Sequence, residues 1–447
     1  MLTCIRKTMV VTMNASRDIL PQTDLWIEDR KIVAIGSYAH HPDRVIDGRN
    51  MVAIPGLVQP HIHLCQTLFR GLADDLSLLD WLEQRIWPLE AALDGDAMRA
   101  SAQLGIAELL AGGTTTILDM GSLHHTEHIL DTMLKMGIRG YSGKCLMDRP
   151  NKFLMQSKED AMQESYDLAH RWHGLDQGRV RYAPAPRFTL SASDALFEEA
   201  RTLADAFHTV LHTHGAETRD EITEGIKLHR RPPIAHLFDQ QILSPSLVIA
   251  HAVWMNADEE DMVATSQSKL VHCPSSNLKL GSGFAPTVRW RQKELTFGIA
   301  ADGAPCNNLL DGFQEMRTAA LLAKPVFGPT YLSAPEVFAH ATIEGARVLG
   351  LEDEIGSLEV GKEADIVLLN FRGPHHQLWD MTPIYSQLVY QTRASDVYLT
   401  MVAGKIVYEN GQYPSLRLDE VEIAAREALI RVLRRAEMEP LLSWMTT

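Results

Sequence analysis

The sequence predicts an α/β protein, a (β/α)8 TIM barrel with a small β-sandwich domain formed from both chain termini. Short apolar runs alternate with helical patterns through the middle of the chain, which is typical of parallel βα units. The two ends of the chain are instead rich in strand-like segments. A length of 447 residues exceeds that of a usual single domain and leaves room for both parts.

The two ends supply the predicted β domain. Residues 24–36 hold two short apolar runs around a polar Glu-Asp-Arg-Lys turn, which is the pattern of a hairpin, and residues 45–50 form another turn. Strand-like runs return at 364–370 and 397–408. An amphipathic helix is predicted over 419–437.

The middle of the chain contains eight candidate strands, which suits a barrel in number and length. They cover residues 52–60, 114–120, 138–144, 179–186, 209–213, 247–250, 269–273 and 295–301, with helical stretches between them such as 96–110, 157–172, 192–206 and 256–266. A doubly wound open sheet is the alternative, but neither GxGxxG nor GxxxxGK[ST] follows any of these strands. The predicted domains are therefore the barrel, 56–355, and the composite β-sandwich with its C-terminal helix, 1–55 and 356–447.

Composition excludes several classes of protein. There are 42 Lys and Arg against 57 Asp and Glu, and the net charge of −15 argues against binding a nucleic-acid polymer. The five cysteines are scattered and form no CxxC pair, which predicts a reducing cytoplasm rather than a disulfide framework. No apolar stretch approaches the ~20 residues that span a bilayer, so we expect no membrane partner. Residues 1–13 lack the apolar region of a secretory signal.

Histidines and carboxylates fall at the C-terminal ends of four predicted strands. These residues are His61 and His63 after the first strand, His214 and Glu217 after the fifth, His251 after the sixth and Asp302 after the eighth. In a barrel such ends open on the face that holds the active site. His61 and His63 lie two apart and so point the same way on a strand. With His214 and Asp302 they form an N3O set that suits Zn2+ or Fe2+ and leaves a position for water.

The same strand ends supply candidates for acid–base chemistry. A bound metal ion lowers the pKa of water to about 7 and so provides a nucleophile at neutral pH. Glu217 is placed to shuttle protons to a leaving nitrogen, and His251 to stabilise the reacting centre. A single His-x-His or Asp-Gly carries little weight, and His212 is explained equally well as a buried histidine beneath His214. The joint pattern at four strand ends favours a metal site.

These residues and their neighbours resemble the amidohydrolase superfamily, within it the purine- and triazine-hydrolysing branch. The matching segments are 54–63, 69–75, 81–82, 87–90, 112–116, 214–217, 271–280, 301–308 and 355–365. The resemblance implies the barrel with its terminal β-sandwich, and a homo-oligomer, either dimer or tetramer. It also implies one catalytic metal on His61, His63, His214 and Asp302, with Glu217 and His251 as acid–base groups.

The resemblance also bears on the number of metal ions. Relatives with two metals carry a carboxylated lysine after the fourth strand, where this chain has Pro186-Arg187-Phe188. We therefore expect one divalent ion, with Zn2+ as the first candidate and Fe2+ as the alternative. Lys144, near the end of the third strand, is the one lysine that leaves a second metal open.

Two sets of residues point to different substrates. The sequence most resembles deaminases of 5′-methylthioadenosine, S-adenosylhomocysteine and 5′-deoxyadenosine, in which the match of Glu90 holds the ribose hydroxyls. Trp87 is expected to line an apolar wall, with helix packing as the alternative, and the loop containing Asn307 favours the same nucleosides. Gln66 and Arg187 instead resemble guanine deaminase, where they read the carbonyl and ring nitrogens of the purine. Substituted s-triazines and pterins also suit them.

The sequence thus predicts a small-molecule enzyme that deaminates an aminated heterocycle by hydrolysis and releases ammonia. The preferred substrate is a 5′-modified adenosine, and the alternatives are guanine or 8-oxoguanine and an s-triazine amino- or chlorohydrolysis. The catalytic candidates are Glu217, His251 and Asp302, and the substrate-binding candidates are Glu90, Arg187, Gln66, Trp87 and Asn307. A non-catalytic scaffold that has lost its ligands is the competing class, and the presence of all four ligands disfavours it.

Overall fold

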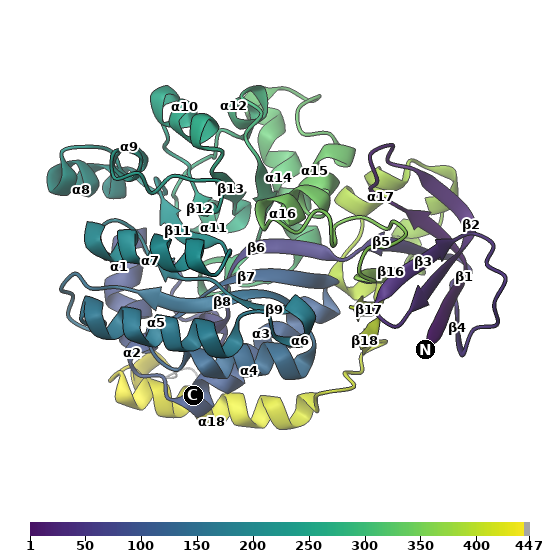
Figure 1. Cartoon of the computed structure of the whole chain (residues 1–447), viewed down its shortest axis with the longest axis horizontal. Helices are drawn as coiled ribbons and strands as arrows, with labels where there is room; N and C mark the ends of the chain where they lie inside the picture. Colours follow the sequence, from purple (N-terminus) through teal and green to yellow (C-terminus); the bar gives the residue numbers. More distant parts are fainter. Residues whose placement is uncertain (442–447) are drawn as a thin grey trace.

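The structure, a computed structural model, describes residues 1–441. Within this range the strands form one mixed sheet at the chain ends and two parallel sheets in the middle (Figure 1). The prediction of an α/β fold with parallel sheets is confirmed. Helices cover the outer faces of the parallel sheets, and the mixed sheet lies to one side of them.

The mixed sheet joins the two ends of the chain. Its strands are β1 (Leu2–Val11), β2 (Ile19–Glu28), β3 (Lys31–Ile35), β4 (Arg44–Asp47), β5 (Met51–Pro55), β16 (Ile366–Asn370), β17 (Val397–Val402) and β18 (Lys405–Glu409). The pairing of β5 with β16 is antiparallel and connects the N-terminal strands to the C-terminal ones. The hairpin predicted over 24–36 is formed by β2 and β3.

The parallel sheets contain all eight predicted strands. One sheet holds β6 (Leu57–His63), β7 (Thr114–Ser122), β8 (Arg139–Leu146), β9 (Val180–Tyr182), β10 (Ala185–Pro186) and β15 (Asp302–Gly303), and the other holds β11 (Leu211–Gly215), β12 (Leu247–His251), β13 (Lys269–His272) and β14 (Phe297–Ile299). The first predicted strand, 52–60, is divided between β5 of the mixed sheet and β6. The fourth, 179–186, is divided into β9 and β10, and the eighth, 295–301, contains β14, with β15 just beyond it. Every residue of β6, β7, β8 and β12 is buried, as expected for parallel strands covered on both faces.

Helices follow most of these strands. Their bounds are η1 (Leu64–Phe69), α1 (Leu78–Trp81), η2 (Leu82–Ile86), α2 (Trp87–Ala91), α3 (Gly95–Ala111), α4 (Thr126–Met136), α5 (Lys158–Trp172), α6 (Leu175–Gly178), α7 (Asp194–Ala206), α8 (Arg219–His229), α9 (Pro233–Asp239), α10 (Ala257–Ser266), α11 (Pro274–Lys279), α12 (Thr287–Gln292), α13 (Ala304–Asn307), α14 (Gly312–Phe327), α15 (Ala334–His340), α16 (Ile343–Val348), η3 (Pro374–His376), η4 (Trp379–Met381), α17 (Ile384–Tyr390), η5 (Ala394–Asp396) and α18 (Leu418–Arg435). No helix in residues 1–441 is long and apolar enough to cross a membrane.

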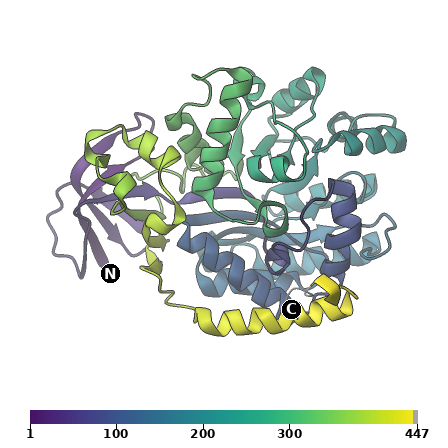
Figure 2. The ribbon, with the colours of Figure 1, turned by 180° about the vertical axis from the view of Figure 1, so that it is seen from behind.

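The last helix, α18, lies along α3 (Figures 1 and 2). Its buried face carries Val421, Ala425, Ala428 and Val432, and small residues on that face allow a close approach to another helix. Arg435 near its end donates a 2.7 Å hydrogen bond to a carboxylate oxygen at the start of α3. The sequence pattern groups α18 with the β-sandwich. In the structure this helix covers the α/β part of the molecule, because its apolar face packs against α3.

A buried charge cluster links the mixed sheet to the parallel sheets. Arg139 at the start of β8 donates to Asp365 at 2.7 Å and to Glu363 at 2.9 Å, and its side chain is 1% exposed. The Asp365 carboxylate also accepts the backbone N–H of Ala403. The acidic residues belong to the motif 355–365, so this motif fixes one part of the fold against the other.

Candidate active site

The ends of β6, β11 and β15 bring three histidines and one aspartate together. Nε2 of His61 and of His63 lie 3.1 and 3.3 Å from Oδ1 of Asp302, and Nε2 of His63 lies 3.2 Å from Nε2 of His214. Ligands held about 2.0–2.1 Å from a tetrahedral Zn2+ are roughly 3.3 Å apart. The four donor atoms therefore have the spacing of ligands to one metal ion.

The histidine nitrogens support the same interpretation. Nε2 of His61 is buried and makes no hydrogen bond of good geometry, although Asp302 is close to it. Its Nδ1 contacts Nε2 of His212 at 2.9 Å, and Nδ1 of His214 donates to the backbone oxygen of Arg187 at 2.7 Å. Such partners on the far nitrogen orient a histidine toward a metal.

Electrostatics favours neutral histidines and an ionised aspartate. Burial lowers the pKa of His61 to about 4 and holds the pKa of His214 well below its usual value. Burial alone would raise the pKa of Asp302, but His61 and the neighbouring histidines outweigh it and hold that pKa well below its usual range. Neutral imidazoles and a carboxylate are the forms that bind Zn2+ or Fe2+.

Glu217 and His251 face this group of ligands. Nε2 of His251 lies 3.6 Å from Glu217 and 3.8 Å from Asp302. Burial raises the pKa of Glu217. Burial would lower the pKa of His251, but the two carboxylates outweigh it and raise that pKa. The pair can hold and transfer protons beside the metal ligands.

The backbone at the site is strained. His251 and Asp302 have φ of 72° and 66°, and Ala216, just before Glu217, has φ of 53°. Left-handed conformations of such residues cost of order 1–3 kcal/mol each and persist where the surroundings fix them. Glu221 helps to fix this turn, because its carboxylate accepts the N–H of Ala216 at 3.1 Å and of Glu217 at 2.6 Å.

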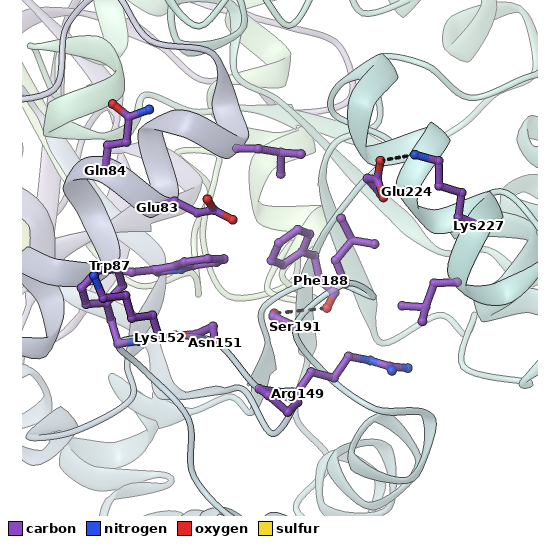
Figure 3. Close-up of a pocket in the computed structure, with 15 residues that line it drawn as sticks. Glu83, Gln84, Trp87, Arg149, Asn151, Lys152, Phe188, Ser191, Glu224 and Lys227 are labelled. Carbon is purple, nitrogen blue, oxygen red and sulfur yellow. Dashed lines mark hydrogen bonds and ion pairs between the residues drawn. The ribbon is translucent and has the colours of Figure 1, made fainter.

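Two cavities adjoin the site. The inner cavity, of about 30 Å³, is lined by the site residues together with Leu78, Trp81, Leu82, Phe188 and Leu280. The outer cavity, of about 920 Å³, opens to solvent and shares Phe188 with the inner one. Trp87 and Phe188 approach it from opposite sides, and charged side chains, among them the ion-paired Glu224 and Lys227, surround it (Figure 3).

Three of the predicted substrate contacts form one buried group. Arg187 donates to Glu90 at 2.7 and 3.3 Å, and Gln66 donates to the same carboxylate at 2.8 Å. Arg187 lines the inner cavity. The Glu90 carboxylate is thus already paired, whereas the resemblance implied one available to ribose hydroxyls.

The other two predicted contacts lie elsewhere. Trp87 lines the outer cavity, whereas the tryptophan that lines the inner cavity is Trp81. Asn307 is not among the residues that line either cavity. Its amide donates to the backbone oxygen of Ala301 and to Glu315, so it braces the segment that leads into Asp302. The role of Asn307 as a substrate contact stays a prediction.

Several other sequence expectations are resolved by contacts. Lys144 is buried and donates to Glu164 at 2.5 Å, so its ammonium group is held away from the metal ligands. His212 is buried and contacts Nδ1 of His61 at 2.9 Å, as a hydrogen-bonded core histidine would. His128, in the first turn of α4, accepts a hydrogen bond from Arg99. Neither His128 nor its neighbours His124 and His125 line the two cavities.

Sequence reasoning missed the residues that support the catalytic side chains. Glu221, Ser276, Asn277 and Ser282 each bond a catalytic residue or its backbone. The sequence did contain a signal, the motif 271–280. This motif identified the segment but did not indicate what its individual residues do. Partners on other strands are needed to see those roles.

Comparison with known proteins places the whole chain among hydrolases. A model of the "Amidohydrolase family" matches residues 52–407. A 5′-deoxyadenosine deaminase of Methanobrevibacter smithii is 37% identical over 408 residues, 91% of this chain and 92% of the relative. A 5-methylthioadenosine/S-adenosylhomocysteine deaminase of Symbiobacterium thermophilum is 34% identical over 435 residues, 95% and 98% of the two chains. A zinc-bound adenosine deaminase from Xanthomonas campestris superposes with a TM-score of 0.90 at 32% identity, over 96% and 98% of the chains.

Proposed function

Because the chain belongs to the amidohydrolase family, we propose that it binds one divalent metal ion, Zn2+ first, and deaminates an aminated heterocycle by hydrolysis. The protein is a hydrolase that acts on carbon–nitrogen bonds. The observation that carries the proposal is the convergence of His61, His63, His214 and Asp302 beside a buried acid–base pair.

The side chains around the metal ligands account for the proton transfers. A metal ion bound there supplies an activated water at neutral pH. Glu217 would accept one proton from that water and deliver it to the ring nitrogen next to the amino-bearing carbon. The second proton of the water, left on the hydroxyl of the attacked carbon, would pass to the amino group, which leaves as ammonia. His251 and Asp302 orient and help to deprotonate the attacking water, since Nε2 of His251 faces both carboxylates. Water attack, proton delivery and release of ammonia balance as a hydrolysis.

We propose a 5′-modified adenosine as the preferred substrate. The relatives named as deaminases of such nucleosides match more than nine-tenths of this chain. The outer cavity, with Trp87 and Phe188 in its wall, offers space beyond the reacting ring for the 5′ substituent. Arg187 contacts the substrate from the inner cavity, and Glu90 and Gln66 hold its guanidinium there.

A guanine-type substrate is the second candidate, and one observation favours it. Arg187 lines the inner cavity together with His63, His214 and Asp302, and a guanidinium there suits a base that carries a carbonyl oxygen. A carbonyl accepts hydrogen bonds from a guanidinium, whereas the amino group of adenine cannot.

A substrate panel distinguishes these proposals. Zinc-loaded protein is incubated with 5′-deoxyadenosine, methylthioadenosine, guanine and 8-oxoguanine, while ultraviolet absorbance and ammonia are followed. We expect turnover of the first two, and no turnover by Glu217→Gln, which serves as the control. Turnover of guanine alone would favour the second candidate. If the protein neither bound metal nor turned over any substrate of the panel, its assignment as a deaminase would be refuted.

We also propose that the parallel sheets close into one (β/α)8 barrel. The N–H groups of His212 and His214 donate to the backbone oxygens of Pro184 and Arg187, which supports a junction between β10 and β11. At the other junction β14 pairs with β13 and β15 pairs with β6, so residues 297–303 act as one eighth strand.

The mixed sheet is proposed to fold over into the small β-sandwich. Ile32 of β3 and Leu399 of β17 belong to one buried apolar cluster, although their strands lie far apart in the order of the sheet. A shared core between distant strands supports two layers packed face to face.

A further inference from the structure

One short segment contacts all three catalytic side chains. This segment, residues 273–283, follows β13 and contains α11. Ser276 donates to Oδ2 of Asp302 at 2.7 Å, Nδ1 of His251 donates to Oδ1 of Asn277 at 2.9 Å, and Ser282 donates to Oε1 of Glu217 at 3.1 Å. The three supporting side chains are all at least 97% buried. Their partners come from three different strand ends.

Each bond selects one atom of its partner. An amide oxygen only accepts, so Asn277 holds a proton on Nδ1 of His251 and leaves Nε2 toward the carboxylates. Ser282 occupies one oxygen of Glu217, and the other oxygen faces His251 at 3.6 Å. The amide nitrogen of Asn277 has no partner in residues 1–441, so its side chain is committed to His251 alone.

The segment is itself held firmly. The N–H of Ser282 donates to the backbone oxygen of Asn277, which closes the segment on itself. The N–H of Ser275 donates to the carboxylate of Glu315 on α14, and the indole of Trp254 donates to the backbone oxygen of Ser282 at 2.6 Å. Side chains on a fixed backbone can set the geometry of the groups that they bond.

We propose that residues 273–283 form a positioning element, in which Ser276, Asn277 and Ser282 set the mutual geometry of Asp302, His251 and Glu217. The inference rests on the proposed deaminase chemistry and assigns a role to the motif 271–280. Asn277 selects the nitrogen of His251 that faces the reaction, and Ser282 selects the oxygen of Glu217 that transfers the proton. These residues act through the catalytic side chains and not on the substrate.

The kinetic test compares Ser282→Ala with Ser282→Thr in the metal-loaded protein. We expect Ser282→Ala to lower kcat roughly 10- to 100-fold with KM nearly unchanged, less than the roughly 10²–10⁴-fold effect of removing an acid–base group. Ser282→Thr keeps the hydroxyl and restores most of kcat. Ser275→Ala is the matched control, because Ser275 lies in the same segment, 273–283, and its N–H, which the variant keeps, bonds Glu315. A kcat for Ser282→Ala equal to that of Ser275→Ala would overturn the role of Ser282.

A spectroscopic test does not depend on the substrate. Protein labelled with ¹⁵N at its histidine rings, loaded with zinc, reports the protonated nitrogen of His251, and His251→Gln assigns the signal. We expect a proton on Nδ1 in the wild type and in Asn277→Asp, and a loss of this preference in Asn277→Leu. An unchanged signal in Asn277→Leu overturns the role of Asn277. If no substrate turns over but the signal changes as expected, the proposed function fails and the positioning role stands.

Discussion

Removal of one partner from the Glu90–Arg187 ion pair gives a sharp test of the inner cavity. The side chains of Arg187 and Glu90 are 5% and 7% exposed, and their closest atoms are 2.7 Å apart. Glu90→Gln leaves the guanidinium buried without a counter-ion. Breaking a buried pair in this way costs about 3–5 kcal/mol, whereas replacing both partners by apolar residues is often neutral.

This loss in the free energy of unfolding can be converted to a change in the melting temperature, Tm. The entropy of unfolding is about 2.1 cal/mol/K per residue, which gives roughly 0.9 kcal/mol/K for 447 residues. Glu90→Gln and Arg187→Met should each lower the Tm by about 3–5 °C. The decrease in Tm of the double variant should be smaller than the sum of the two single decreases, because no buried charge remains unpaired.

The assay is a double-mutant cycle on zinc-loaded protein, with melting followed by calorimetry and by circular dichroism. Arg187→Met should also raise KM, since Arg187 lines the inner cavity. Strictly additive losses in the double variant would refute the pair as one buried unit. Glu83→Gln in the outer cavity is the control and should leave the Tm unchanged.

Three further predictions concern the metal, the proton transfer and the fold. Asp302→Asn should lower bound metal well below one ion per chain, measured by plasma mass spectrometry, while a wild-type metal content would contradict its role as a ligand. Burial raises the pKa of Glu217 above 4.5, and the reaction needs its carboxylate, so kcat/KM should fall as the pH drops through that raised pKa; an acid limb at or below pH 4.5 would count against Glu217. Arg139→Met leaves Asp365 buried without its cation, whereas Glu363 keeps Arg30 and Lys31, and the variant should lower the Tm by about 3–5 °C in calorimetry. A Tm within 1 °C of the wild type would show that this cluster does not join the two parts of the fold.

The strands and the convergence of the candidate metal ligands could be predicted because their signals are local. Buried parallel strands are continuous apolar runs, and a side chain that must reach the active face follows the end of such a run. His61, His63, His214 and Asp302 all satisfy this rule, and the structure brings them together. The parallel α/β architecture followed from the same periodicity.

The supporting contacts could not be predicted, because each depends on a partner distant in sequence. Glu90 and Arg187 are 97 residues apart, and nothing local to Glu90 indicates that its carboxylate is already paired. Asn307 was predicted as a substrate contact from the resemblance of its segment to nucleoside deaminases, and nothing local indicates that its amide bonds Glu315 on the next helix. An amphipathic pattern such as that of α18 gives the buried face of a helix but not the surface that it covers.

The charges around the inner cavity bear on the kind of substrate that it accepts. The pKa of Asp302 is held low, and histidines bind a metal ion as neutral imidazoles, so a divalent ion, Asp302 and an ionised Glu217 together carry no net charge. Glu90 and Arg187 cancel each other on the adjoining wall. His251 and Glu221 line the same cavity and both have raised pKa values, and they bear opposite charges when ionised. The reacting group therefore meets a desolvated site of little net charge, although the chain as a whole carries −15. Such a site suits an uncharged aminated ring, whose ring nitrogen gains a proton only as the attack proceeds, because an anionic group there would be buried without a counter-charge.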